Sequence, residues 1–124
     1  MNGNNFLIDT NIIIYLTQGR LNTSGFAKKG EYLYISSVTY IEALGYPFSS
    51  QDKEQATVEL CEMFERLFLT EEVEKQTILI RKANKIKLPD AIIAATAMVY
   101  NLTLVTRNSD DFKNIPGLKI LNPF

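Results

Sequence analysis

Short apolar runs alternate with longer stretches of helical spacing along this chain. Four of the short runs, at residues 6–8, 32–35, 102–106 and 118–121, are rich in β-branched, aromatic or leucine side chains, which is typical of buried strands. A further short strand is expected around residues 68–69, between two helices. Because strands and helices alternate, the pattern predicts an α/β sandwich around a mainly parallel central sheet.

Capping residues ahead of helically spaced apolar positions predict the helices. Asp9, Thr10 and Asn11 are helix N-cap types, and they favour a helix from Ile12 onward although three consecutive isoleucines favour a strand. The remaining helices are expected at residues 39–45, 50–68, 71–84 and 90–100. The last of these is apolar nearly all round and rich in alanine, so we expect it to be buried and closely packed.

Composition narrows the class of protein. The 124 residues predict a single domain over residues 1–124, with a net charge of −1 and a pI of about 5.4. This balance lacks the basic signature of a dedicated nucleic-acid binder, so such binding would need a local basic patch or a metal bridge. The chain has no histidine, and Cys61 is its only cysteine, which fits a cytoplasmic protein. Neither a transmembrane run nor a secretory signal is expected.

Acidic residues recur where predicted strands end or helices begin. Asp9 follows the first strand, and Glu42 lies in the helix after the second. Asp90 opens the alanine-rich helix, and Asp110 and Asp111 come soon after the strand at 102–106. Residues just past the carboxyl ends of parallel strands meet in one crevice, where carboxylates repel one another unless a cation joins them. Oxygen ligands favour Mg²⁺ or Mn²⁺, so the pattern predicts metal-assisted hydrolysis, with a phosphodiester as the favoured substrate.

Each acid alone also fits a structural role. Asp9 is a common N-cap residue. Thr39 and Glu42 match a capping box, in which the Glu42 carboxylate bonds back to the Thr39 amide. Asp90 suits the positive end of a helix dipole, and aspartates after a strand are ordinary turn residues. The metal interpretation therefore rests on the set of acids and not on any one of them.

Polar and basic neighbours complete the candidate site. Thr39 and Thr106 could hold carboxylates by hydrogen bonding, as outer groups do at metal sites, although capping or filling buried polar space are alternatives. The supporting residues are Thr10, Asn11, Thr39, Thr106 and Asn108. Arg107, Lys85 and Lys87 lie near the acids in the sequence and could contact phosphates without reading sequence. For any one lysine, a solvated surface is the better interpretation.

Four segments match a known family in order and approximate spacing. They are FLIDTN at residues 6–11, ISSVTYIEAL at 35–44, LPDAIIAATA at 88–97 and LVTRNSDDF at 104–112. On these segments the chain resembles the PIN-domain ribonucleases, in particular the VapC-type toxins of bacterial toxin–antitoxin systems. The ending at residues 115–123 is also similar, so the resemblance covers nearly the whole chain.

The resemblance implies a three-layer α/β/α fold with a Mg²⁺- or Mn²⁺-dependent endoribonuclease site. Asp9, Glu42 and Asp90 fall on the metal-binding acids of the family. Some members carry aspartate where Asn108 stands, and others rely on the acid that Asp111 matches. Because an amide is a weaker metal ligand than a carboxylate, we favour Asp111 as the fourth acid, with Asn108 as an oxygen donor or orienting group.

The resemblance also implies a homodimer and a cognate antitoxin that blocks the site, with the helices between residues 51 and 84 as its candidate groove. Two other functions are open at this point. One is a PIN-like binding module without catalysis, against which the presence of all three principal acids argues. The other is a receiver-type signalling domain. That class needs paired acids after the first strand, whereas here Ile8 precedes Asp9.

Overall fold

A computed structural model describes residues 5–28, 31–45 and 47–124. In this part of the chain, five parallel strands form one sheet in the order β3-β2-β1-β4-β5. The strands are β1 Phe6–Ile8, β2 Leu33–Ser36, β3 Glu65–Leu67, β4 Thr103–Val105 and β5 Lys119–Leu121. Receiver-type domains instead use the order 2-1-3-4-5. The receiver alternative is therefore wrong, and the prediction of a mainly parallel sheet is confirmed.

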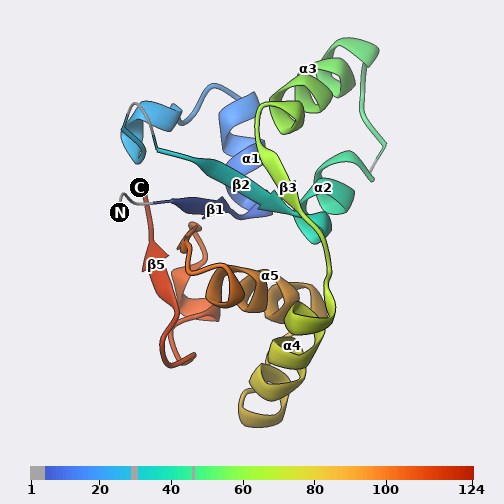
Figure 1. Cartoon of the computed structure of the whole chain (residues 1–124). Helices are drawn as coiled ribbons and strands as arrows, with labels where there is room; N and C mark the ends of the chain where they lie inside the picture. The colour runs from blue at the N-terminus through green and yellow to red at the C-terminus, as the bar shows by residue number, and fades with distance from the viewer. Residues whose placement is uncertain (1–4, 29–30, 46) are drawn as a thin grey trace.

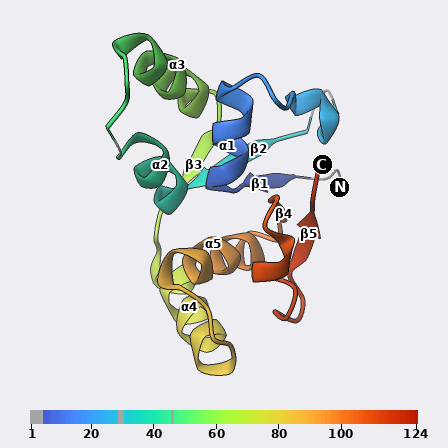
Figure 2. The same cartoon turned by 180° about the vertical axis from the view of Figure 1, so that it is seen from behind.

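Helices cover both faces of the sheet, as Figures 1 and 2 show. The helices are α1 Thr10–Thr17, α2 Ser37–Leu44, α3 Gln51–Glu62, α4 Glu71–Ala83 and α5 Leu88–Val99. The first three lie on one face, while α4 and α5 lie on the other, which confirms the three-layer α/β/α sandwich. The longest, α4, has 13 residues, and none of the helices in the described ranges has the length and apolarity that crossing a membrane requires.

Alternation along the central strand supplies the two cores. In β1 the side chains of Phe6 and Ile8 join the apolar cluster under α1, α2 and α3, while Leu7 joins the cluster under α4 and α5. This is the period of two that strand geometry dictates. Helix α5 is buried as predicted, and its small side chains, Ala91 and Ala94 among them, let α4 and the sheet approach closely.

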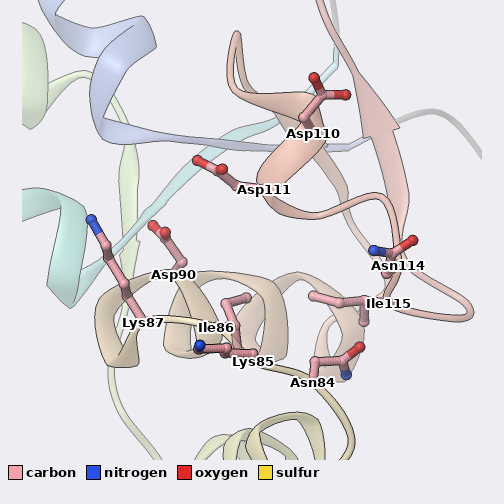
Figure 3. Close-up of a pocket in the computed structure, with 9 residues that line it drawn as sticks. All are labelled: Asn84, Lys85, Ile86, Lys87, Asp90, Asp110, Asp111, Asn114 and Ile115. Atoms are coloured by element: carbon pink, nitrogen blue, oxygen red, sulfur yellow. The ribbon is translucent and has the colours of Figure 1, made fainter.

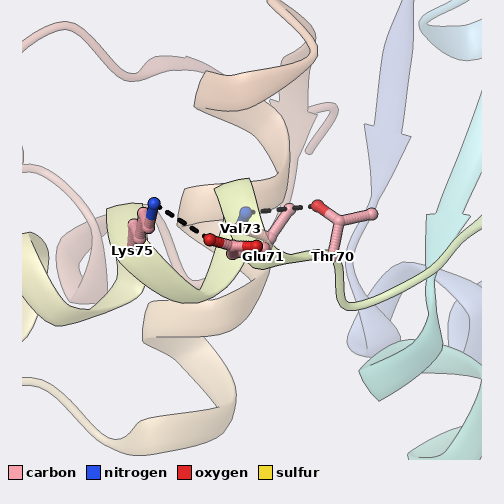
Figure 4. Close-up of polar contacts among 4 residues, drawn as sticks. All are labelled: Thr70, Glu71, Val73 and Lys75. Carbon is pink, nitrogen blue, oxygen red and sulfur yellow. Dashed lines mark hydrogen bonds and ion pairs between the residues drawn. The ribbon is translucent and has the colours of Figure 1, made fainter.

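Helix α4 begins at Glu71, as the sequence predicts, and Thr70 is its N-cap. The Thr70 hydroxyl accepts a hydrogen bond from the amide of Val73 at 3.2 Å, as Figure 4 shows. In the next turn, the Lys75 ammonium lies 3.0 Å from the Glu71 carboxylate, an i,i+4 ion pair on the solvent face. The cap satisfies one of the free amides of the first turn, and the predicted helix over 71–84 is confirmed.

Helix α2 begins at Ser37, ahead of the predicted start at Thr39. The reason is its cap, because the Ser36 hydroxyl accepts a hydrogen bond from the Thr39 amide at 3.1 Å. Thr39 is therefore inside the helix and fully buried, and the capping box proposed for Thr39 and Glu42 is wrong. The Glu42 carboxylate is therefore available to another partner.

Two boundaries fall where the periodicity did not place them. Helix α3 ends at Glu62, although the pattern predicts it to continue to Phe68, and β3 occupies residues where helix was expected. Pairing of β3 with β2, with Leu67 opposite Ser36, outweighs the local helical spacing. The strand expected around residues 68–69 therefore lies earlier. Helix α5 begins at Leu88, so Asp90 is in its first turn as predicted.

Candidate active site

The carboxyl ends of β1 and β4 lie side by side, and the residues that follow them fix one buried carboxylate. Ile8 is in register with Val105, so Asp9 and Thr106 emerge together. The Thr106 hydroxyl donates to Asp9 Oδ2 at 2.8 Å, and the Thr10 amide donates to Asp9 Oδ1 at 2.8 Å. Both carboxylate oxygens of Asp9 thus accept hydrogen bonds, and the residue is only 5% exposed. The local role as N-cap and the site role coexist in one side chain.

Thr10 connects Asp9 to helix α2. Its hydroxyl donates to Glu42 Oε1 at 2.6 Å and lies 3.2 Å from the hydroxyl of Thr39. The Glu42 carboxylate, which is exposed, is therefore directed toward the end of β1 and not back along its own helix. Two of the predicted acids, from segments far apart in the sequence, are brought to the same place by one threonine.

Asn11 ties the loop after β4 to the same assembly. Its amide nitrogen lies 3.3 Å from Asp9 Oδ2 and 3.4 Å from the Thr106 hydroxyl, and its carbonyl accepts from the backbone amide of Arg107 at 3.3 Å. The backbone amide of Asn108 donates to the Thr106 hydroxyl at 3.0 Å. We call this set the hydrogen-bonded wall; its members are Asp9, Thr10, Asn11, Thr39, Glu42 and Thr106.

The other predicted acids line an open pocket of about 410 Å³, drawn in Figure 3. It lies between the start of α5 and the segment that joins β4 to β5. We call it the charged pocket; it is lined by Asn84, Lys85, Ile86, Lys87, Asp90, Asp110, Asp111, Asn114 and Ile115. Asp90 is half-buried at its base, whereas Asp111 is exposed opposite. The predicted lysines, Lys85 and Lys87, therefore share a pocket with three of the acids named from the sequence, Asp90, Asp110 and Asp111.

The acids of the hydrogen-bonded wall interact electrostatically with Asp90 in the charged pocket. Burial raises the pKa of Asp9 to about 6, against the hydrogen bonds from Thr106 and Thr10, which lower it. The negative charges of Asp90 and Glu42 raise that pKa further. Three acids from three segments, Asp9, Glu42 and Asp90, therefore interact electrostatically.

The pKa of Asp90 shows the same coupling from the pocket side. Burial makes the largest contribution to the raised pKa of Asp90, and the charges of Asp111 and Glu42 add to it, while the charge of Lys87 lowers that pKa. The charge of Asp90 in the charged pocket thus raises the pKa of Asp9 in the hydrogen-bonded wall, and the charge of Glu42 in that wall raises the pKa of Asp90. A group of like charges of this kind is stabilised most directly by a cation placed between them.

The donor set fits a hard divalent cation. The acids supply only oxygen atoms, the ligands that Mg²⁺ and Mn²⁺ prefer. Among the described residues the ion pairs are Lys75–Glu71 and Lys113–Asp110, so no direct ion pair neutralises Asp9, Glu42 or Asp90. Within the same residues, no three acidic side chains already form a closed metal cage. A bound ion would therefore have to draw the carboxylates closer together.

Some predicted residues are turned elsewhere. The Arg107 guanidinium lies 4.5 Å from the ring centroid of Phe124 and 5.3 Å from that of Tyr15, so it stacks on aromatic rings beside β5. Asp110 lines the outer part of the charged pocket and pairs with Lys113 at 3.7 Å. The structure therefore places Asp111, and not Asp110, beside Asp90.

Sequence reasoning missed four lining residues of the charged pocket. They are Asn84, Ile86, Asn114 and Ile115. Asn84 ends α4, and Asn114 with Ile115 stands in the turn before β5. No pattern within either segment signals that they meet. Only the packing of α4 and α5 under the sheet could have revealed it.

Comparison with known proteins identifies the family. Residues 6–118 match the PIN domain family. The chain belongs to that family. A protein named ribonuclease VapC1 from Rickettsia felis is 32% identical over 126 residues, which cover 93% of each chain. A ribonuclease VapC from Rickettsia bellii is 30% identical with the same coverage.

Solved structures of toxin–antitoxin proteins share the whole fold. A toxin–antitoxin complex from Klebsiella pneumoniae has 34% sequence identity and a TM-score of 0.79, and the match covers 95% of this chain and 97% of that one. VapBC-1 from nontypeable Haemophilus influenzae has 27% identity and a TM-score of 0.76, over 96% and 98% of the two chains. The resemblance found in the sequence is thereby confirmed.

Proposed function

We propose that this chain is a divalent-metal-dependent endoribonuclease and the toxin of a toxin–antitoxin pair. The observation that carries the proposal is the convergence of Asp9, Glu42, Asp90 and Asp111 on one electrostatic group at the carboxyl ends of the strands. Relatives at about a third identity are named ribonucleases, and similar solved structures are toxin–antitoxin complexes. A binding-only PIN-like module would not require four acids to converge in this way.

Asp9, Glu42 and Asp90 would hold a Mg²⁺ or Mn²⁺ ion. When bound, such an ion supplies Lewis-acid activation of water and neutralises charge on the scissile phosphate. The hydrogen bonds from Thr10 and Thr106 orient Asp9, which limits the reorganisation needed on binding.

The residues of the charged pocket would act on the RNA. We assign Asp111 the role of accepting a proton from the attacking water, because it is exposed beside Asp90 and carries no ion-pair partner among the described residues. Lys85 and Lys87 would bind backbone phosphates as point charges without reading sequence. No covalent intermediate with the protein is required.

The antitoxin would bind on the side of α1 and α3. A pocket of about 410 Å³ lies there, lined in part by Ile14, Thr17 and Ala56. The expected groove between residues 51 and 84 is revised here, because α3 and α4 lie on opposite faces of the sheet; the proposed groove keeps α3 and replaces α4 by α1. Further parts of the proposal are a homodimer and action in the cytoplasm, where RNA and a cognate antitoxin are available.

RNA cleavage tests the proposed function. Purified protein is incubated with total cellular RNA and Mg²⁺ or Mn²⁺, with EDTA as one control and Asp90→Asn as another. We expect discrete fragments that disappear with EDTA and a loss of at least about 10³-fold in Asp90→Asn, because several kcal/mol of charge stabilisation is removed. Asp52→Asn, on exposed α3, should cleave like the wild type.

Two results would count against the proposal. Cleavage that persists in both EDTA and Asp90→Asn would exclude the metal mechanism. Absence of cleavage with every metal, together with tight binding of RNA, would favour the binding-only module. Toxicity on expression that Asp9→Ala relieves would support the assignment as a toxin.

A further inference from the structure

A group of arginine and aromatic side chains lies beside the hydrogen-bonded wall and outside the charged pocket. We call it the arginine–aromatic cluster; its members are Tyr15, Arg20, Arg107 and Phe124. The Arg107 guanidinium contacts the rings of both Phe124 and Tyr15, as described above. The Arg20 guanidinium lies 4.7 Å from the same Tyr15 ring centroid, and the two rings meet edge to face with centroids 4.8 Å apart. Three segments distant in the sequence thus bring two positive charges and two rings together.

Neither arginine of the cluster is neutralised by an acid in the part of the chain that the structure describes. None of the ion pairs there involves Arg20 or Arg107. Within the same residues, Arg107 forms hydrogen bonds only through its backbone amide and carbonyl, and the Arg20 guanidinium has one long contact, at 3.5 Å, to the side chain of Gln18. Both arginines are exposed. Their N–H donors are therefore available to an anion, and the planar guanidinium suits a phosphate.

The arginine–aromatic cluster is continuous with the hydrogen-bonded wall. Arg107 directly follows Thr106 of the wall, and its backbone amide donates to the side chain of Asn11 at 3.3 Å. Tyr15 comes four residues after Asn11 in α1, so the two side chains lie on the same helix face about one turn apart. The cluster therefore extends from the wall along α1, next to the place where the acids meet.

Asn122 helps to fix the positions of the cluster residues. Its side-chain nitrogen donates to the Arg107 carbonyl at 3.3 Å, and its side-chain oxygen accepts from the Phe124 amide at 3.0 Å. The Tyr15 ring is partly buried and packs against the apolar cluster under α1, α2 and α3, whereas Phe124 is 51% exposed. One ring is therefore anchored in the fold, while the other presents apolar surface to a ligand.

We propose that the arginine–aromatic cluster binds single-stranded RNA beside the bond that is cut, with Arg20 and Arg107 on backbone phosphates and Phe124 stacked on a base. The inference rests on the proposed ribonuclease function, which places the scissile phosphate at the acids. Proteins that bind single strands without reading sequence combine positive charge along the backbone with aromatic rings on which bases stack. Lys85 and Lys87 precede α5, on the other face of the sheet. The two basic groups would therefore hold the strand on either side of the acids.

RNA binding without metal tests the inference apart from cleavage. Fluorescence anisotropy follows a short labelled single-stranded RNA in EDTA at several salt concentrations. We expect the double variant Arg20→Gln, Arg107→Gln to bind about tenfold more weakly at low salt and to reduce the slope of log K against log salt by about 1.4, or 0.7 for each lost contact. The control Lys75→Gln, Arg81→Gln removes two exposed charges from α4 and should stay within about twofold of wild type, because salt screens distant charges.

Two further variants separate charge from stacking. Phe124→Leu removes a ring but no charge, so it should weaken binding by about fivefold or more, the lower limit for a lost base stack, without changing the salt slope. Arg20→Lys with Arg107→Lys keeps both charges, so the slope should return to the wild-type value. A cluster with only a structural role would leave RNA affinity and the salt slope unchanged in all of these variants.

Two results of the binding experiments would overturn the inference. One is the same RNA affinity and salt slope in the arginine double variant as in the α4 control. The other concerns polyglutamate with as many charges as the RNA, which has no bases to stack and should bind the wild type at least about fivefold more weakly. Equal affinity for polyglutamate, lost in the arginine double variant, would identify an acidic protein segment as the ligand of the cluster.

Cleavage kinetics distinguish a failure of this inference from a failure of the proposed function. With Mg²⁺, the arginine double variant should raise KM for a single-stranded RNA by about tenfold with a much smaller change in kcat, because the lost contacts lie away from the reacting atoms. An unchanged KM would sink the inference and leave the ribonuclease intact. RNA binding that depends on the cluster, with no cleavage under any metal, would do the reverse.

Discussion

The two walls of the candidate site are built in opposite ways. In the hydrogen-bonded wall, Asp9 is buried and both of its oxygens accept hydrogen bonds at 2.8 Å. In the charged pocket, Asp90 is half-buried and Asp111 is exposed, with Lys87 acting on Asp90 only through its charge. One wall is fixed before any ligand arrives, whereas the other is open and can adapt to one.

The difference has a physical origin in the sheet. Asp9 follows the central strand and Thr106 the strand beside it, so both are held by backbone pairing. Asp90 lies in the first turn of a helix and Asp111 ends a short 3₁₀ turn, where fewer backbone contacts fix the side chain. Preorganised groups lower the cost of binding a cation, while adaptable ones accommodate substrates.

Neighbouring aspartates provide the sharpest test of the pocket wall. Asp111→Asn should lower kcat/KM for RNA by about 10²–10³-fold, since a general base contributes up to about 10⁴-fold. Asp110→Asn should cost less than about threefold, because Asp110 pairs with Lys113 away from Asp90. Steady-state kinetics on one RNA measure both variants. Equal losses would mean that the turn does not distinguish the two acids.

The buried carboxylate of Asp9 should make the unfolding free energy depend on pH. The pKa of Asp9 is raised from 3.8 to about 6, so folding favours its protonated form. The stability this gives is complete below pH 3.8 and is lost as the pH rises through about 6. The unfolding free energy of metal-free wild type relative to Asp9→Asn should therefore fall by up to about 3 kcal/mol between pH 3.8 and 7. Urea unfolding at several pH values measures it.

If the difference in unfolding free energy between wild type and Asp9→Asn stays constant from pH 3.8 to 7, burial does not raise the pKa of Asp9. Added Mn²⁺ should reduce the decline, because a cation stabilises the ionised carboxylate.

Removing one hydroxyl tests the preorganisation of Asp9. Thr106→Val deletes the hydrogen bond to Asp9 Oδ2 and should lower kcat/KM by about 10–100-fold, as outer groups at metal sites do. Thr77→Val is the matched control, since Thr77 is also buried and its hydroxyl bonds to the Val73 carbonyl in α4. Both variants should lose about 1 kcal/mol of stability. Similar activity losses in the two would assign the effect to folding alone.

Phosphate contacts should give the smallest effect. Replacing Lys85 and Lys87 together by alanine should weaken RNA binding about tenfold at low salt and reduce the slope of log K against log salt by about 1.4, or 0.7 for each lost contact. Lys119→Ala, on β5 outside the pocket, is the control. Filter binding at several salt concentrations measures the slope. An unchanged slope would place the lysines on a solvated surface.

Local signals in the sequence predicted much of this arrangement. Cap residues indicated the start of α1, the range of α4 was predicted from the sequence, and the alanine-rich pattern identified α5 as buried. Strand ends indicated the region of Asp9 and Glu42. These features depend on neighbours along the chain, so a sequence pattern carries them.

Other features depend on contacts between distant segments. The strand β3 exists because it pairs with β2, although its residues continue a helical pattern. The partner of Glu42 is Thr10, 32 residues earlier, and not the nearby Thr39 amide. Asn84 meets the turn before β5 only through packing of α4 and α5. No local pattern distinguishes such partners from solvent-facing residues.

Direct titration with Mn²⁺ tests whether the two walls share one cation. Binding is followed by electron paramagnetic resonance, which reports free Mn²⁺, for wild type, Asp9→Asn, Asp90→Asn and the control Thr77→Val. We predict that the wild type and Thr77→Val bind alike, and that Asp9→Asn and Asp90→Asn each weaken the affinity by at least about 100-fold, because a charged ligand is lost from either wall. Wild-type affinity in either aspartate variant would contradict the account.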